Sequence, residues 1–179
     1  MSDVRHKCFI SYHHDDQAEV DEFVNTFDEE RDVFITRGLG IEIAPEIVNS
    51  DDADYVMRRV KELYLKDSTV TIVLVGTCTW ARRFVDWELQ SSLRHGETAT
   101  PNGVLGIVLA SVGKNPIAPE RLRVNLNSDT KDGYARWYWY PTRTDALAGW
   151  IDDAYEARTT RAHLIINSRD RFKNNRTCP

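Results

Sequence analysis

One segment near the start of the chain places polar side chains directly after an apolar run. Residues 7–16 begin Lys-Cys-Phe-Ile, continue into Ser11, Tyr12 and His13, and end in a second histidine and two aspartates. An imidazole at such a break could contact a phosphate group. Because ligands of open α/β sheets bind beyond the carboxyl ends of strands, we expect this segment to form a functional edge.

A second segment places an aromatic ring and an acid on one side of a predicted helix. Phe84 and Glu88 are separated by four positions, so on a helix they face the same way. At about 100° per residue, Val85, Leu89 and Ser92 form the face that packs on the sheet. Glu88 is therefore expected at the border between core and solvent. A carboxylate beside an aromatic ring, close to a strand's carboxyl end, is a candidate catalytic group.

The pattern of apolar residues predicts the elements that position these two segments. Asp15 or Asp16 is expected to cap the helix that follows the first strand. The expected strands are residues 7–12, 33–35, 69–76, 104–110 and 136–140, and the expected helices cover about 16–27, 52–65, 80–94 and 145–157. Strands that alternate with helices predict a parallel, doubly wound sheet of about five strands with helices on both faces.

Length and charge limit the domain organisation and the partners. The 179 residues predict one α/β domain over residues 1–160 and a basic C-terminal extension over 161–179. The net charge of −5 argues against nucleic acid as a partner. Residues 158–179 carry six Lys or Arg and one acid. This extension is expected to pack on the domain or to fray, as chain ends do, although it could contact a phosphate-bearing ligand or an acidic partner.

The apolar runs and the cysteines predict the cellular location. The apolar runs at residues 70–76 and 104–110 are far shorter than the roughly 18 residues that a membrane span needs, so we expect no membrane association. Three cysteines, Cys8, Cys78 and Cys178, are an odd number without metal-ligand spacing. They predict a reduced, cytoplasmic protein without a metal site.

The two segments together resemble TIR domains. The sequence Phe-Ile-Ser-Tyr at 9–12 is similar to the first conserved box of that family, and 84–89 resemble the helix that carries its catalytic glutamate. TIR domains commonly have Trp at the position of Phe84. Flavodoxins, Rossmann domains and response-regulator receivers fit less well, because residues 12–16 lack a Ser/Thr-rich or Gly-rich loop and the third strand does not end in Asp. The resemblance implies a single flavodoxin-like, TIR-like domain, and the aromatic fifth strand is similar to the ThsB subfamily of bacterial Thoeris antiphage systems.

The resemblance also implies a substrate and a set of site residues. NAD would be the substrate, no cofactor would stay bound, and Glu88 would be the catalytic residue. Breaking the nicotinamide–ribose bond needs no general acid, because the leaving group is already cationic, but it does need a carboxylate near the developing oxocarbenium charge. The residues expected to bind NAD are Phe9, Ser11, Tyr12, His13 and Phe84.

The function implied by the resemblance is antiphage signalling. The enzyme would make a cyclic ADP-ribose-type messenger for a separate effector, with a phage component as a candidate trigger. Self-association is expected through residues 37–49, where TIR domains carry their BB loop. Two alternatives stay open: a non-catalytic interaction module and an NAD glycohydrolase that only depletes the cofactor.

Overall fold

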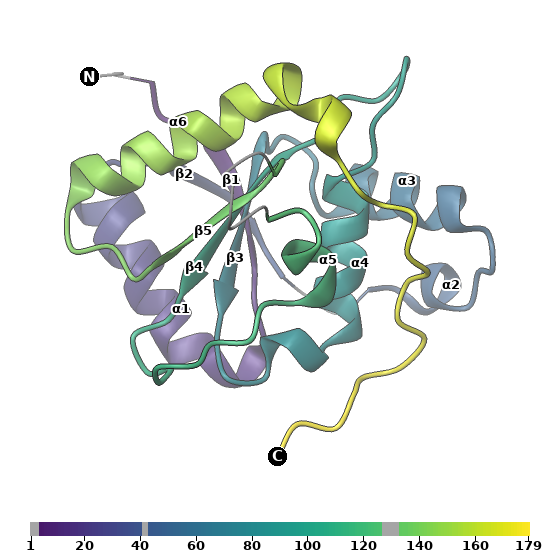
Figure 1. Ribbon diagram of the computed structural model, residues 1–179, viewed down its shortest axis with the longest axis horizontal. Coiled ribbons are helices and arrows are strands. Elements are labelled where there is room, and N and C mark those ends of the chain that lie inside the picture. Colours follow the sequence, from purple (N-terminus) through teal and green to yellow (C-terminus); the bar gives the residue numbers. More distant parts are fainter. Residues whose placement is uncertain (1–3, 41–42, 127–132) are drawn as a thin grey trace.

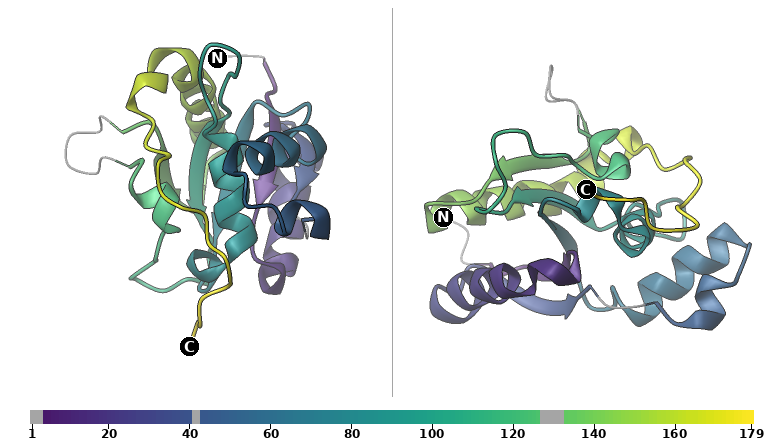
Figure 2. Two further views of the ribbon diagram at one scale, coloured as in Figure 1. Left: turned by 90° about the vertical axis from the view of Figure 1, so that its right-hand side faces the viewer. Right: turned by 90° about the horizontal axis from the view of Figure 1, so that it is seen from below.

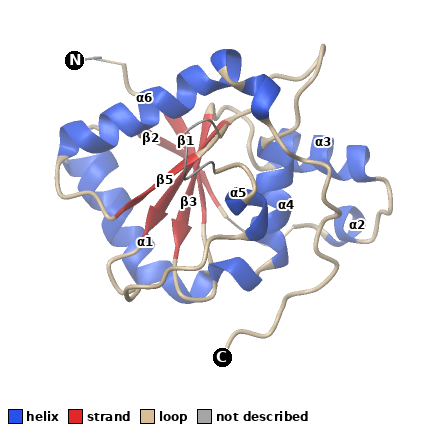
Figure 3. Cartoon of the chain, in the orientation of Figure 1, coloured by secondary structure: helices blue, strands red, loops and turns tan. Residues whose placement is uncertain are grey.

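A computed structural model describes residues 4–40, 43–126 and 133–179 of the chain. Five parallel strands form one sheet at the centre, with helices on both sides (Figures 1 and 3). The strands are β1 (Lys7–Ser11), β2 (Ile35–Leu39), β3 (Val70–Val75), β4 (Gly103–Val108) and β5 (Arg136–Trp139). The prediction of a flavodoxin-like α/β fold with a parallel, doubly wound sheet is confirmed.

The strands lie in the order β2-β1-β3-β4-β5, so the chain changes direction across the sheet between β1 and β3. Crevices beyond the carboxyl ends of strands at such a switch point are the usual ligand sites of doubly wound folds. The arrowheads in Figure 3 point to this edge of the sheet. At this edge, β1 ends at Ser11 and β3 ends at Val75.

The helices cover the two faces unequally. α1 (Gln17–Val24), which continues as a π-helical segment over Asn25–Glu30, packs on one face together with α6 (Thr144–Thr160). α4 (Arg83–Ser92) and the short α5 (Glu120–Arg123) cover the other face. α2 (Pro45–Val48) and α3 (Ala53–Leu63) pack on the outer side of α4, as the left view of Figure 2 shows. α4 is therefore enclosed, and every residue from Val85 to Ser92 is buried.

The second strand was predicted two residues too early and too short. Residues 33 and 34 are buried core residues, but the ladder with β1 begins at Ile35, opposite Lys7, and continues to Leu39. β2 is an edge strand, and its polar residues do not give the continuous apolar signal of a central strand. Residues 41 and 42, in the predicted BB loop, lie outside the described residues.

The prediction that Asp15 or Asp16 caps α1 is wrong. Asp16 occupies the N-cap position, but its side chain makes no capping hydrogen bond. Its carboxylate instead lies against Gly76 at the end of β3, where a Cβ atom would collide with it. Burial and the nearby Glu19 raise the pKa of Asp16.

The cysteines differ from the expected reduced state. Cys78, in the turn after β3, forms a disulfide with Cys178, and only Cys8 is free among the described cysteines. The spacing of 100 residues gives no sequence signal for this pairing. The disulfide places the end of the chain beside the carboxyl edge of the sheet. In the described part of the chain, no helix has the length and apolar character that a membrane crossing requires.

Candidate active site

The segment after β1, Gly40 after β2 and the start of α4 line a cavity of about 150 Å³. Tyr12 and His13 line it from the segment after β1, and Phe84 and Glu88 line it from α4. These are four of the six residues that the sequence nominates. Residues separated by more than seventy positions therefore meet at the topological switch point of the sheet.

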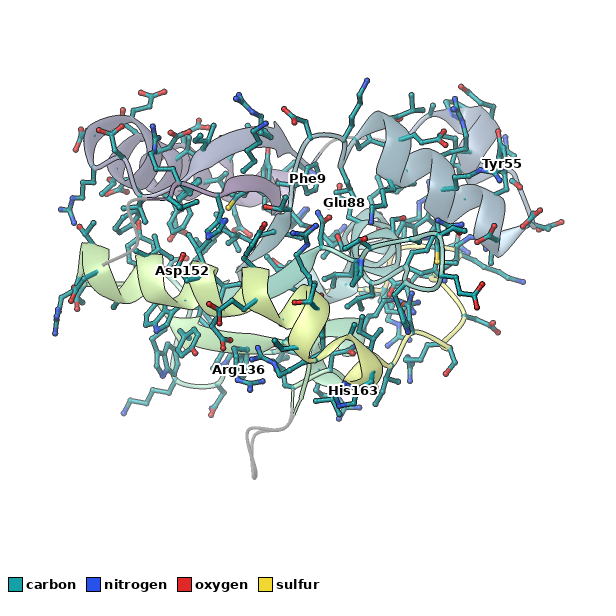
Figure 4. The ribbon with its side chains drawn as sticks, turned by 90° about the horizontal axis from the view of Figure 1, so that it is seen from above. Phe9, Tyr55, Glu88, Arg136, Asp152 and His163 are labelled. Atoms are coloured by element: carbon teal, nitrogen blue, oxygen red, sulfur yellow. A yellow bond between two sulfur atoms is a disulfide. The ribbon has the colours of Figure 1, made fainter. Side chains whose placement is uncertain are left out.

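Glu88 is the central acidic residue of this cavity. Its Oε2 atom accepts a hydrogen bond of 2.5 Å from Ser11 Oγ, although Ser11 itself does not line the cavity. Glu88 is only 2% exposed, so its predicted position at the border with solvent is wrong. Figure 4 shows it inside the molecule, whereas Tyr55 on α3 lies at the edge. A buried carboxylate needs polar partners, and the Ser11 hydroxyl is one of them.

Gly40 brings the backbone after β2 close to this carboxylate. Its amide donates a 2.6 Å hydrogen bond to Ile10 O, which holds it beside β1. A Cβ atom at position 40 would lie 3.2 Å from Glu88 Oε1 and 3.3 Å from Oε2. A residue with a side chain would therefore crowd both carboxylate oxygens. Sequence analysis missed this residue, since nothing local marks it.

The two predicted phenylalanines have different surroundings. The Phe84 ring lines the cavity and makes an edge contact with the Trp87 ring, with 6.1 Å between the ring centroids. The guanidinium of Arg83 lies over the Phe84 ring, 4.8 Å from its centroid. Phe9 is 1% exposed and is not among the lining residues. Its ring packs under Gly38, where an added Cβ would lie only 2.8 Å from Phe9 Cδ2. Phe84 is thus the ring available to a ligand.

Tyr12 continues the wall of the cavity beyond β1. Its hydroxyl donates a 2.5 Å hydrogen bond to Gln17 Oε1, at the first residue of α1. Burial raises the pKa of Tyr12, with an opposing contribution from this hydrogen bond. The side chain is consequently a neutral phenol that contributes ring surface and is held in place by α1.

His13 and His14 both turn toward the carboxylate of Asp15. The Nε2 atoms lie 3.0 Å and 3.1 Å from the two Asp15 oxygens. Burial lowers the pKa of His13, and Arg82 lowers it further, while Asp15 acts in the opposite direction. One possible ligand atom from each of the three residues lies within 4.8 Å of the others, a grouping that could hold a cation and that the sequence analysis did not anticipate.

Arg82 and Asn175 also line the cavity, and sequence analysis did not nominate either as a ligand-binding residue. Arg82 immediately precedes α4, and its Nε atom is buried without a hydrogen-bond partner. Within the described residues its guanidinium has no ion pair, so it is a cation available to an anionic ligand. Asn175 comes from the opposite end of the chain, and no periodicity in the sequence could have placed it here.

Comparison with known proteins identifies a family. The family model described as Thoeris protein ThsB, TIR-like domain, matches residues 9–114, which is more than half of the chain. This range includes Ser11, Gly40, Arg82, Phe84 and Glu88, and it ends before α5, β5 and α6. No curated protein matches the chain.

Proposed function

The chain belongs to the ThsB TIR-like family of Thoeris antiphage systems, and from this premise we propose that it cleaves the nicotinamide–ribose bond of NAD. The observation that carries the proposal is the buried Glu88 carboxylate, which lines a cavity at the switch point of the sheet and is hydrogen-bonded to Ser11. Burying a carboxylate costs free energy unless polar groups satisfy it, and buried acids that line a cavity are candidates for function.

The chemistry of the bond matches a site with one carboxylate. Nicotinamide leaves as a neutral molecule from a cationic ring, so the leaving group needs no proton. Positive charge then develops on the ribose, and a carboxylate held close to it stabilises the transition state more than the ground state. Glu88 supplies this charge, the Ser11 hydrogen bond holds its Oε2 atom, and both carboxylate oxygens lie beside Gly40.

The other lining groups match the remaining parts of the substrate. The Phe84 ring offers a surface for the cationic nicotinamide ring, on which cation–π attraction acts. The unpaired Arg82 guanidinium suits the diphosphate, because it can donate two parallel hydrogen bonds to phosphate oxygens. The cavity of about 150 Å³ is smaller than the roughly 300–1,000 Å³ of most small-molecule sites. It would therefore hold the nicotinamide end, with the rest of NAD along the rim.

We further propose that the product is a cyclic ADP-ribose-type signal that activates a separate effector during infection. Cyclisation requires that a nitrogen of the adenine, at the other end of the same molecule, attacks the ribosyl carbon that nicotinamide has left before water does. Self-association through residues 37–49 would shield the rim, since this segment adjoins the cavity at Gly40.

The test compares nucleotides in phage-infected cells that express the wild-type chain, Glu88→Gln or the control Glu97→Gln. Glutamine keeps the shape of Glu88 and can still accept the Ser11 hydrogen bond, but it carries no charge. Glu97 is an exposed acid. Liquid chromatography with mass spectrometry should find NAD loss and a new cyclic species with the wild type and Glu97→Gln only. Removing the charge should lower turnover at least about 100-fold.

Two other results would change the assignment. Loss of NAD with linear ADP-ribose as the only product would indicate a glycohydrolase that depletes the cofactor. Identical nucleotide profiles for the wild type and a folded Glu88→Gln would reject the enzyme and favour a non-catalytic interaction module.

A further inference from the structure

The last residues of the chain run along α4 in the opposite direction to the helix (Figure 1 and the left view of Figure 2). We name residues 166–178 the C-terminal strap. Four hydrogen bonds join the strap to α4 and to the turn before it. Near the end of the helix, Asn167 Nδ2 donates to Gln90 O at 3.0 Å, and Phe172 N donates to Asp86 Oδ2 at 2.8 Å. Near its start, Arg83 N donates to Asn175 Oδ1 at 2.9 Å, and Arg176 N donates to Ala81 O at 2.8 Å. The strap therefore follows the whole helix that carries Glu88.

A buried ion pair and a disulfide hold the strap in the middle and at the end. Arg121 is 1% exposed, and its Nε atom lies 2.9 Å from Asp86 Oδ1. The same guanidinium donates to the backbone carbonyl of Arg169 at 3.0 Å. Beyond Asn175, Cys178 is bonded to Cys78 in the turn after β3. The strap is thus fixed to α4, which lines the cavity, and to the turn after β3.

Asn175 is the strap residue that reaches the cavity. It lines the same cavity as Phe84 and Glu88, and its Oδ1 atom accepts from the backbone N–H of Arg83, the first residue of α4. Helix N-termini leave such donors without intrahelical partners, and Arg82, the N-cap residue, provides no side-chain cap. The cap of α4 is therefore supplied by a residue 92 positions away.

We propose that the C-terminal strap is a wall of the NAD pocket and that Asn175 is a positioning residue for the first turns of α4. The proposal rests on the proposed function and extends it to residues beyond the 9–114 match. A displacement of about 1 Å in a reacting group is enough to lower a rate by about 100-fold, so an element that fixes the helix of Glu88 controls the site without touching the reacting atoms.

The experiment uses the full chain with Asn175→Ala, Asn175→Asp and the control Asn174→Ala. Asn174 is an exposed neighbour. Hydrogen exchange of the Arg83 amide is first measured without nucleotide. The NAD dissociation constant is then measured for each variant combined with Glu88→Gln, so that binding is observed without turnover. Circular dichroism verifies that each variant is folded.

Asn175→Ala should raise the exchange rate of Arg83 about tenfold and weaken NAD binding about tenfold, whereas Asn174→Ala should change neither. Asn175→Asp should restore the slow exchange, because a carboxylate also caps a helix. Unchanged exchange in Asn175→Ala would overturn the positioning role. Faster exchange with unchanged or tighter NAD binding would overturn the proposal that the strap forms a wall of the NAD pocket. The strap would then cover α4 without contributing to NAD binding. If the wild-type chain leaves NAD intact, the proposed function fails while the exchange result still decides whether Asn175 positions α4.

Discussion

The Ser11 hydroxyl donates a 2.5 Å hydrogen bond to Glu88 Oε2, which joins the last residue of β1 to the second turn of α4. Both residues are buried, and 77 positions separate them in the sequence. Charge-assisted hydrogen bonds of this kind are stronger than those between neutral groups. The contact fixes the carboxylate at one oxygen, and it makes the geometry of the candidate catalytic group depend on the strand as well as on the helix.

Replacing Ser11 by Ala should lower activity more than it lowers substrate affinity. The Glu88 carboxylate would lose a hydrogen-bond donor and gain rotational freedom, so kcat for NAD loss should fall about tenfold with little change in KM. A buried carboxylate with one partner fewer should also reduce the free energy of unfolding by about 1–3 kcal/mol. Steady-state kinetics and urea unfolding measure the two effects. An unchanged kcat would mean that Ser11 does not orient Glu88.

Replacing Gly40 by Ala should disturb the site without removing any polar group. The added Cβ would lie 3.2–3.3 Å from the two Glu88 oxygens, a distance that forces the carboxylate to shift by a few tenths of an ångström. We expect kcat to fall about tenfold while the melting temperature changes little. Gly113→Ala is the matched control, since a Cβ there meets no atom within 4 Å. Equal kinetics for both variants would exclude a close approach of Gly40 to the working carboxylate.

The central strands and the placement of Phe84 on the same side of α4 as Glu88 could be predicted because they depend on local patterns. β3 is apolar or β-branched along its whole length, as expected for a strand buried on both faces. Phe84 and Glu88 share a helix face at four-residue spacing, and both line the cavity. The burial of Glu88 could not be predicted, because the helical spacing accounts only for the face of α4 toward the sheet. The Glu88 carboxylate is covered by Ser11 at the end of β1 and by the backbone at Gly40 after β2.

The parts of the site that escaped prediction come from contacts between distant residues. Asn175 reaches Arg83 across 92 positions, and Cys178 reaches Cys78 across 100. Neither pair leaves a periodic pattern. The edge strand β2 was misplaced for a different reason: Thr36, Arg37 and Gly38 follow its first residue, Ile35, so the apolar signal stops where the strand begins. A local pattern of apolar residues therefore fails to predict contacts between residues far apart in the sequence, and it fails to place an exposed edge strand.

His13 should make the stability of the protein fall as the pH decreases below about 6.5. Burial and Arg82 lower its folded-state pKa, partly opposed by Asp15, with His14 as the other neighbouring charge. The unfolded chain, with an ordinary histidine pKa near 6.5, therefore binds a proton first, and protonation favours unfolding. Well above pH 6.5 His13 is neutral in both states, and its contribution to stability is complete.

Urea unfolding at several values between pH 7.5 and pH 5 tests this prediction. His13→Asn should lose less stability on acidification than the wild type, because one group that takes up a proton on unfolding is absent. His163→Asn, at an exposed histidine, should follow the wild-type slope. A wild-type slope in His13→Asn would show that the burial of His13 does not govern the titration.

Reduction of the Cys78–Cys178 disulfide should lower stability substantially. The bond closes a loop of about one hundred residues, and removing a native disulfide typically costs about 2–5 kcal/mol. A dithiol, which is itself oxidised to a cyclic disulfide as it supplies two electrons, should shift the urea midpoint of the wild type downward. The double variant Cys78→Ser/Cys178→Ser should unfold at that lower midpoint with or without the dithiol.

Counting thiols in the denatured chain tests the pairing directly. Purified without reductant and then unfolded, the wild type should expose one reactive thiol, that of Cys8, and three after reduction. Three thiols before reduction would show that the chain is reduced as isolated. In that case the Arg121 contacts and the hydrogen bonds along α4 would hold the strap without a covalent link, and the dithiol should leave the unfolding midpoint where it is.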